Sequence, residues 1–88
     1  MELKDTITLM QSEDYKDRLK AEYWQTKIRY EKLKAANTKQ EILCRMNPFP
    51  TEKNEDVVRR ELMNAQQHCM GEYLHLLELR AELDGIKL

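Results

Sequence analysis

A seam of apolar residues running from Val58 to Ile86 is the feature that most constrains the fold of this chain. Read in alternating steps of four and three, the stretch meets nine positions, of which eight are apolar and one, Glu72, is charged. A repeat sustained in this way is typical of an α-helix that packs along its length against other helices. The nine positions are Val58, Leu62, Ala65, Cys69, Glu72, Leu76, Leu79, Leu83 and Ile86.

A second stripe lies beside this seam and widens the apolar face toward the C-terminus. Its six members are Met63, Gln66, Met70, Tyr73, Leu77 and Ala81. A single partner helix leaves one flank of so wide a face open, so the sequence predicts a dimer or higher oligomer that covers it.

The whole chain is predicted to be all-α, with a short N-terminal helix followed by a long antiparallel helical hairpin that self-associates. We expect one domain, residues 1–88, with helices over about 2–10, 13–45 and 52–84. The buried face of the second helix is expected to carry Leu19, Tyr23, Thr26, Tyr30 and Leu33.

The ends of the second helix carry two signals. Ser12 precedes two acidic residues, a pattern that predicts the N-cap. Near Asn37 we expect a bend or brief break, because residues 38–41 match a capping box, although a continuous helix stays open.

The turn of the hairpin is predicted at residues 47–50, where two prolines stop the second helix. Phe49 is expected to pack against this end of the hairpin. The third helix has two candidate caps, Thr51 and Asn54.

The third helix is predicted to end at Gly85. This glycine suits a Schellman motif in which Ile86 folds back on the helix and contacts Leu83 or Leu79.

Charge and hydropathy narrow the classes of partner. The chain carries 15 basic and 16 acidic residues, so no bulk field attracts nucleic acid, and DNA binding is not expected. No secretory leader or membrane-spanning stretch is visible, which predicts a cytoplasmic protein without membrane contact. Cys44 and Cys69 have no paired spacing, so we expect reduced thiols, with Cys69 buried as a small apolar residue.

Basic and aromatic side chains along the second helix form the candidate ligand-binding set. They are Tyr15, Lys16, Arg18, Trp24, Lys27 and Arg29. Cations of this kind hold phosphate groups, and an aromatic ring stacks on a base. The alternative interpretation is a solvated helix face held by pairs such as Asp14–Arg18 and Lys27–Glu31, with Trp24 in an oligomer interface.

A metal site and an enzyme activity are both disfavoured by the sequence. Glu72 and His75 have the spacing of a metal motif in helical bundles. His68 and His75 are roughly 10 Å apart along a helix, too far to share an ion, so no metal or other cofactor is expected. No Gly-rich phosphate loop or catalytic triad is present, so we expect a protein that is not an enzyme.

Two segments resemble a family of small helical proteins from phages and prophages, named from a crAss-like phage. The segments are Met10-Gln-Ser-Glu-Asp-Tyr-Lys-Asp-Arg-Leu-Lys-Ala-Glu-Tyr-Trp-Gln-Thr-Lys-Ile-Arg-Tyr-Glu-Lys-Leu33 and Met70-Gly-Glu-Tyr-Leu-His-Leu-Leu-Glu-Leu-Arg-Ala-Glu-Leu-Asp-Gly-Ile86. Residues 37–54 depart from the family pattern, which has a Gly- and Cys-containing turn there. The hairpin plan is also similar to that of the phage anti-CBASS sponges for cyclic nucleotides.

The resemblance implies a function in phage infection. The implied function is that of a phage-encoded, non-enzymatic antagonist of bacterial immunity. Such a protein would be a homo-oligomeric sponge that sequesters a cyclic nucleotide or related signalling nucleotide in the bacterial host cytoplasm. Two alternatives stay open: an inhibitor that docks its apolar helix face onto a host immune protein, and a phage accessory protein with no ligand.

Overall fold

The computed structural model describes residues 1–47 and 53–88, and all regular structure in these residues is helical. A 3₁₀ turn, η1 (Leu3–Asp5), leads into α1 (Thr6–Met10), followed by α2 (Tyr15–Met46) and α3 (Asn54–Leu83). The all-α prediction and the long hairpin are therefore confirmed. The predicted proline stop at residues 48–50, the packing of Phe49 and the Thr51 cap lie outside the described residues.

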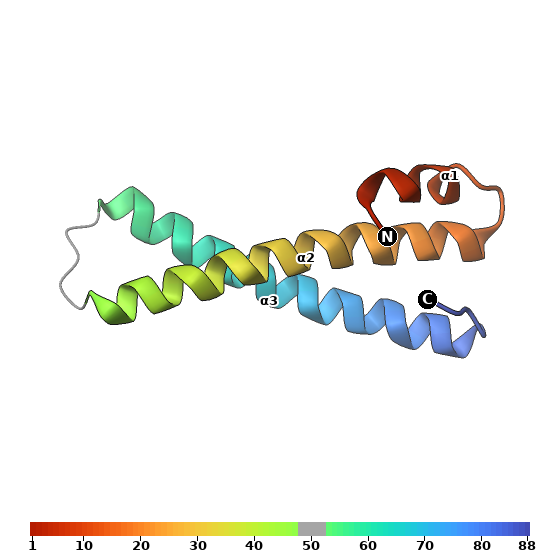
Figure 1. Ribbon diagram of the computed structural model, residues 1–88. Helices are drawn as coiled ribbons and strands as arrows, with labels where there is room; N and C mark the ends of the chain where they lie inside the picture. Colours follow the sequence, from red (N-terminus) through yellow and green to blue (C-terminus); the bar gives the residue numbers. More distant parts are fainter. Residues whose placement is uncertain (48–52) are drawn as a thin grey trace.

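The two long helices cross near their middles, so the hairpin is a shallow X (Figure 1). The α1 helix lies along the N-terminal part of α2, and within the described residues it contacts α2 but not α3. The molecule is elongated, with extents of 52 × 25 × 19 Å. None of the described helices is both long enough and apolar enough to cross a membrane.

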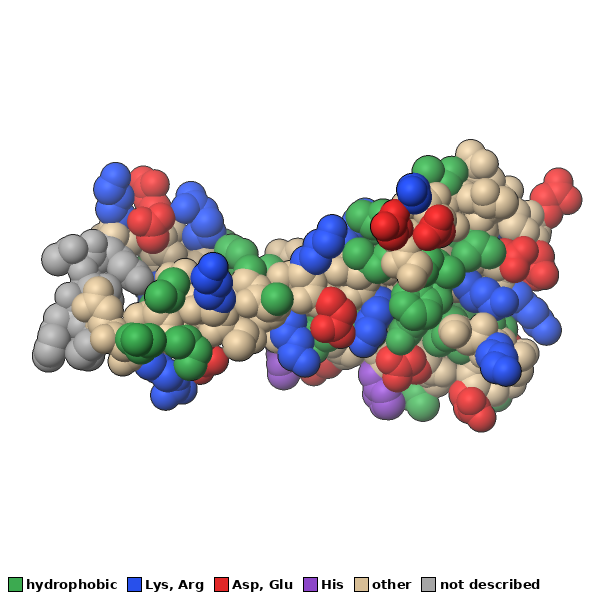
Figure 2. All heavy atoms as spheres, in the orientation of Figure 1, with side chains coloured by type: hydrophobic (Ala, Val, Ile, Leu, Met, Phe, Trp, Pro, Cys, Tyr) green, Lys and Arg blue, Asp and Glu red, His purple; other side chains and the backbone are tan. Residues whose placement is uncertain are grey.

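The buried core is confined to the end of the hairpin where both chain termini lie. Leu19 and Tyr23 of α2 pack there against α3 and the C-terminal segment; the residues that complete the core are Leu74, Leu77, Ala81 and Ile86. Figure 2 shows apolar side chains gathered at this end. Each fully buried leucine contributes roughly 1.5–3 kcal/mol to folding, so this cluster anchors the hairpin.

The seam that dominates the sequence of α3 does not form the contact with α2. Leu76, Leu79 and Leu83 are 57%, 53% and 84% exposed, whereas Leu77 of the second stripe is completely buried. The α3 helix turns Leu77 and Ala81 of the second stripe toward the core together with Leu74, whereas Gln66 and Tyr73 of that stripe are exposed, because α2 meets α3 at a crossing and covers one face only. Cys69, predicted to be buried, is exposed for the same reason.

Helix α2 is continuous, so the expected bend near Asn37 is wrong. The Asn37 side chain is buried, and its Nδ2 atom donates to the Met63 carbonyl oxygen at 3.1 Å and to Gln67 Oε1 at 2.9 Å. A residue with weak helix propensity is thus held in the helix by hydrogen bonds across the crossing.

The helix caps differ from the predicted residues. Asp14 caps α2, since its Oδ1 accepts from the Lys16 amide at 2.9 Å. Ser12 sits two residues earlier, where its hydroxyl accepts from the Asp14 amide and donates to Asp17 Oδ2. The N-cap of α3 is Lys53, so Asn54, one of the two candidate caps, is the first helical residue instead.

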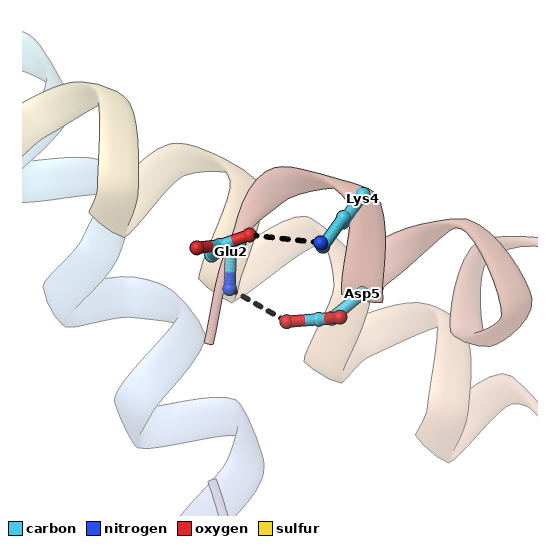
Figure 3. Close-up of polar contacts among 3 residues, drawn as sticks. All are labelled: Glu2, Lys4 and Asp5. Atoms are coloured by element: carbon cyan, nitrogen blue, oxygen red, sulfur yellow. Dashed lines mark hydrogen bonds and ion pairs between the residues drawn. The ribbon is translucent and has the colours of Figure 1, made fainter.

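The first helical segment begins at about residue 2, as expected, and its start carries a capping box (Figure 3). The Glu2 amide donates to Asp5 Oδ2 at 2.8 Å, and Lys4 Nζ lies 3.4 Å from Glu2 Oε2. The predicted first helix is confirmed, but its first turn is 3₁₀.

The C-terminus of α3 is a Schellman motif, as predicted. Gly85 has φ +67°, its amide donates to the Glu82 carbonyl oxygen at 3.3 Å, and the Ile86 amide donates to that of Ala81 at 2.8 Å. Ile86 belongs to the buried core, whereas Leu79 and Leu83 point to solvent. The motif is confirmed, and Ile86 belongs to the core cluster, of which neither leucine is a member.

Candidate ligand groove between α2 and α3

The six residues selected from the sequence do not line one pocket within a chain. Residues that are two positions apart in an α-helix are rotated by about 200° from each other about the helix axis. Arg18 therefore projects across the helix from Lys16, and Arg29 projects across it from Lys27. The six residues remain a prediction for an assembly, but one chain divides them between opposite sides of α2.

Arg18 and Tyr15 hold the end of the hairpin together. Arg18 Nη1 donates to the carbonyl oxygens of Ser12 and Glu13 at 3.0 and 2.8 Å, which fixes the connection between α1 and α2. The Tyr15 hydroxyl donates to Asp84 Oδ2, and this hydrogen bond raises the pKa of the Tyr15 phenol. Both residues therefore have structural partners, and the Asp14–Arg18 pair expected in the alternative interpretation does not form.

Trp24 and Lys27 are half-buried near the core. The Trp24 ring stands edge-on to Tyr23, with centroids 5.3 Å apart, and packs against the core cluster. Lys27 Nζ lies 3.0 Å from Glu31 Oε1, and the hydrogen bond to Glu31 raises the pKa of Lys27. The expected Lys27–Glu31 pair is thus confirmed.

Lys16 and Arg29 are exposed. Within the described part of the chain, neither side chain has a hydrogen bond or an ion pair. They are available to an anion but lie far apart, because thirteen positions span about 20 Å of helix.

A different set of residues forms a continuous hollow, which we call the α2–α3 groove. It is an open groove of about 720 Å³ on one side of the crossing. It is lined by Tyr30, Asn64, Gln67, His68, Gly71, Glu72, His75 and Leu76. Only Tyr30 comes from α2; the remaining residues share one side of α3.

The floor of the groove is formed where Tyr30 lies against Gly71. A Cβ atom at Gly71 would stand 3.4 Å from Tyr30 Cε2 and 3.5 Å from the Tyr30 hydroxyl oxygen. The small residue at position 71 lets the ring lie against α3, because a Cβ atom there would already be in van der Waals contact with it. The half-buried ring is thereby held in place and lines the groove.

Two lysine side chains of α2 lie close to the Tyr30 ring. Lys27 and Lys34, one turn before and one turn after Tyr30, each place Nζ 5.9 Å from the ring centroid. Across the groove, His68 Nε2 lies 3.5 Å from Glu72 Oε1, and both side chains are largely exposed. In Figure 2 the histidines stand along one edge of the middle of the molecule. The arrangement offers cations, amides and an aromatic ring to a ligand.

Among residues 1–47 and 53–88, no group of three or more His, Cys, Asp or Glu side chains is close enough to hold a metal ion. His68, Glu72 and His75 share the groove, and His68 Nε2 lies 3.5 Å from Glu72 Oε1.

Of the groove residues, Tyr30, His68, Glu72 and His75 were visible in the sequence as parts of other patterns. Gly71 was the sequence signal that could have indicated that these residues line one groove. A glycine in the middle of a 30-residue helix costs about 1 kcal/mol relative to alanine, so its presence points to close packing of another group.

Fold and groove together define a small all-α protein, a helical hairpin with an open groove at its crossing that is lined by an aromatic ring. A family model for Sequestin matches residues 13–83, which include all of α2 and α3. The chain therefore belongs to the Sequestin family. Comparison with curated proteins and with solved structures gave no match.

Proposed function

We propose that this Sequestin-family protein sequesters a cyclic nucleotide or related signalling nucleotide in the α2–α3 groove, without converting it. The observation that carries the proposal is Tyr30, a ring that lines an open groove with Lys27 and Lys34 on either side. The family name denotes sequestration, which agrees with a protein that binds and withholds a ligand.

The chemistry of the groove suits a nucleotide. The part of the Tyr30 ring that lines the groove contacts a base, and base–aromatic stacking is worth about 1–3 kcal/mol in single-stranded nucleic acid complexes. The ammonium group of Lys34, beside the ring, holds phosphate oxygens, whereas Lys27 is paired with Glu31. On α3, the amides of Asn64 and Gln67 present donors and acceptors to the edge of the base.

Binding without turnover is part of the proposal. The groove holds histidines and a carboxylate but neither a serine nor a cysteine. Catalysis by a nucleophile requires that residue within hydrogen-bond reach of its base. The groove is also open to solvent, which favours reversible capture over water-excluded chemistry.

The biological role that we propose is a phage-encoded antagonist of bacterial immunity, which acts as a homo-oligomer in the host cytoplasm. Support comes from the resemblance of residues 10–33 and 70–86 to small helical phage proteins.

A thermal-shift panel of cyclic di- and trinucleotides and cyclised ADP-ribose products tests the proposal. Ligand at about 100 times Kd stabilises the folded state by about 2.7 kcal/mol, which raises Tm by several degrees. Linear mononucleotides serve as controls. A shift with one cyclic class supports the proposal, and no shift with any member contradicts it.

A second candidate function is inhibition of a host protein by docking. It is favoured by the outer face of α3, where Val58, Leu62 and Leu79 are more than half exposed. Affinity capture from host lysate tests it: one stoichiometric host protein, lost when Leu79 is replaced by lysine, supports docking. Recovery of this chain alone argues against it.

A further inference from the structure

The outer face of α3 carries an apolar stripe that the described residues of the chain leave exposed. We call it the outer seam: Val58, Leu62, Ala65, Cys69, Glu72, Leu76, Leu79 and Leu83, all of which are exposed. Seven of these eight residues are apolar, and they run the length of α3 in heptad spacing. Soluble monomers rarely expose a contiguous apolar surface of this kind.

We propose that a second copy of this chain docks in parallel along the outer seam, and that it places the partner's Tyr73 and Arg80 beside the α2–α3 groove. The site is then shared between two chains. This inference deepens the proposed function and rests on it for the identity of the ligand, but the pairing itself is independent of any ligand.

The residues flanking the seam identify the occupant as a second copy. One flank carries Arg59, Gln66, Tyr73 and Arg80, and the other carries Glu61, His68, His75 and Glu82, all exposed. In a parallel pair, the first flank of one copy faces the second flank of the other copy. With neutral histidines, no two side chains of like charge from these flanks then face each other.

An antiparallel pair with full overlap is disfavoured by the same residues. It would place Glu61 opposite the partner's Glu82 and Arg59 opposite the partner's Arg80, and each of these contacts would occur twice. The parallel arrangement has one cost, because it brings the two copies of Glu72 together inside the seam. A single polar residue in a seam commonly fixes the register at a cost in stability, and His68 Nε2 lies 3.5 Å from Glu72 Oε1 on the flank of the seam.

The seam is continuous with the groove, which links pairing to binding. Glu72 and Leu76 belong to both the seam and the groove lining, and the two histidines of the groove lie on one flank. In a parallel coiled coil a residue on this flank meets the partner residue roughly five positions later. His68 therefore meets the partner's Tyr73, and His75 meets the partner's Arg80.

The partner residues supply what the single-chain groove lacks. The guanidinium of the partner's Arg80, which interacts with the Tyr15 side chain of its own chain, binds phosphate through two parallel N–H···O hydrogen bonds, which lysine does not form. A second ring from Tyr73 stands across from Tyr30 and closes part of the open side. Pairing thus converts an exposed groove into a two-sided site, and a dimer contains two such sites by symmetry.

The oligomeric mass of the full chain tests the pairing surface. Replacing Leu62 and Leu79 by lysine should convert a dimer into a monomer by light scattering. The matched control replaces Ile42 and Leu43 by lysine; these α2 residues are each 53% exposed but lie away from the seam. A monomeric wild type, or dissociation of the control but not of the seam variant, overturns the inference.

The native cysteine of the seam tests the parallel register without any ligand. Two parallel copies place their Cys69 thiols side by side, so mild oxidation of the Cys44→Ser protein should give a disulfide-linked dimer. The same treatment of the Cys69→Ser protein should not. Failure of the Cys44→Ser dimer to cross-link contradicts the parallel arrangement.

Mixing two defective proteins tests whether the site is shared. Arg80→Gln and Lys34→Glu proteins should each lose binding of the cyclic nucleotide with the largest thermal shift in the panel. Because random pairing leaves one intact groove in each mixed dimer, an equal mixture should recover about a quarter of the wild-type sites. No recovery, with mixed dimers present by mass, overturns the shared site. If no nucleotide binds the wild type, the proposed function fails, whereas mass and cross-linking still decide the pairing.

Discussion

The ring of Tyr30 lies on Gly71, and this contact joins the two long helices at the candidate groove. A Cβ atom at Gly71 would meet Tyr30 Cε2 at 3.4 Å, an ordinary van der Waals separation. A methyl group therefore fits beneath the ring, but any longer side chain would displace it.

Replacing Gly71 by alanine should stabilise the protein by up to about 1 kcal/mol. Alanine removes the entropic cost of a glycine inside a helix, and its methyl group needs no movement of the ring. Urea unfolding followed by circular dichroism measures the change. Replacing Gly71 by leucine should instead displace Tyr30 and weaken nucleotide binding, which thermal shift detects.

Gly85 provides the matched control, because alanine there should act in the opposite direction. Its φ of +67° is strained for any residue with a Cβ atom, although open space surrounds the position. We expect a loss of about 1 kcal/mol in the same urea experiment. Equal signs at the two glycines would show that backbone conformation does not distinguish them.

Replacing Asn37 by alanine should destabilise the hairpin by about 1–2 kcal/mol, because two acceptors on α3 lose their donor. Chemical unfolding of this variant and of Thr38→Ala, an exposed neighbour, compares the two sites. Alanine raises the helix propensity at both positions, so Thr38→Ala should be neutral or stabilising, and a loss of similar size there would contradict the role of the buried hydrogen bonds.

The Tyr15 hydroxyl should titrate above the ordinary range of a tyrosine, because its hydrogen bond to Asp84 raises the pKa. A folded-state pKa above the unfolded value means that this contribution to stability is present below the unfolded pKa and is lost as pH rises through the folded one. Phenolate absorbance of the wild type, compared with Tyr15→Phe, gives the pKa. Asp84→Asn should lower it, and an unchanged Tyr15 titration in that variant would contradict the assignment.

Replacing Lys34 by glutamate should weaken nucleotide binding at least tenfold, since a charged hydrogen bond contributes about 1.5–3 kcal/mol. Lys16→Glu is the control: it makes the same charge change on α2, but eighteen positions away, about 27 Å along the helix. Isothermal titration calorimetry of both variants separates a local contact from a general effect of net charge. Equal weakening would move the site away from Tyr30.

Periodicity predicted the elements of this fold well, because the helical faces of α2 follow the 3.6-residue repeat directly. Leu19 and Tyr23 were expected at the hairpin contact and are buried there. The repeat of α3 contains two stripes, however, and the choice between them depends on the crossing with α2. Leu77 rather than Leu76 faces the core for that reason, which no local pattern encodes.

The candidate site was predicted less well, because it depends on contacts between helices. The sequence analysis grouped Lys16 and Arg18 in one candidate set, yet the two side chains project to opposite sides of α2 and the Arg18 guanidinium binds backbone carbonyls. Similarly, a break was predicted at Asn37 because the local sequence does not reveal its hydrogen-bond partners, which lie 26 and 30 residues later on α3. Tyr30 was assigned to the buried face, and only its contact with Gly71 shows that it also lines a groove.

The most direct test of nucleotide sequestration is a capture-and-release measurement. The protein is incubated with the cyclic nucleotide that gives the largest thermal shift, free nucleotide is separated by filtration, and the protein is then denatured by heat. We predict that free nucleotide falls in proportion to binding sites and that denaturation returns it chemically unchanged. Undiminished free nucleotide, or release of a converted product, would contradict the account.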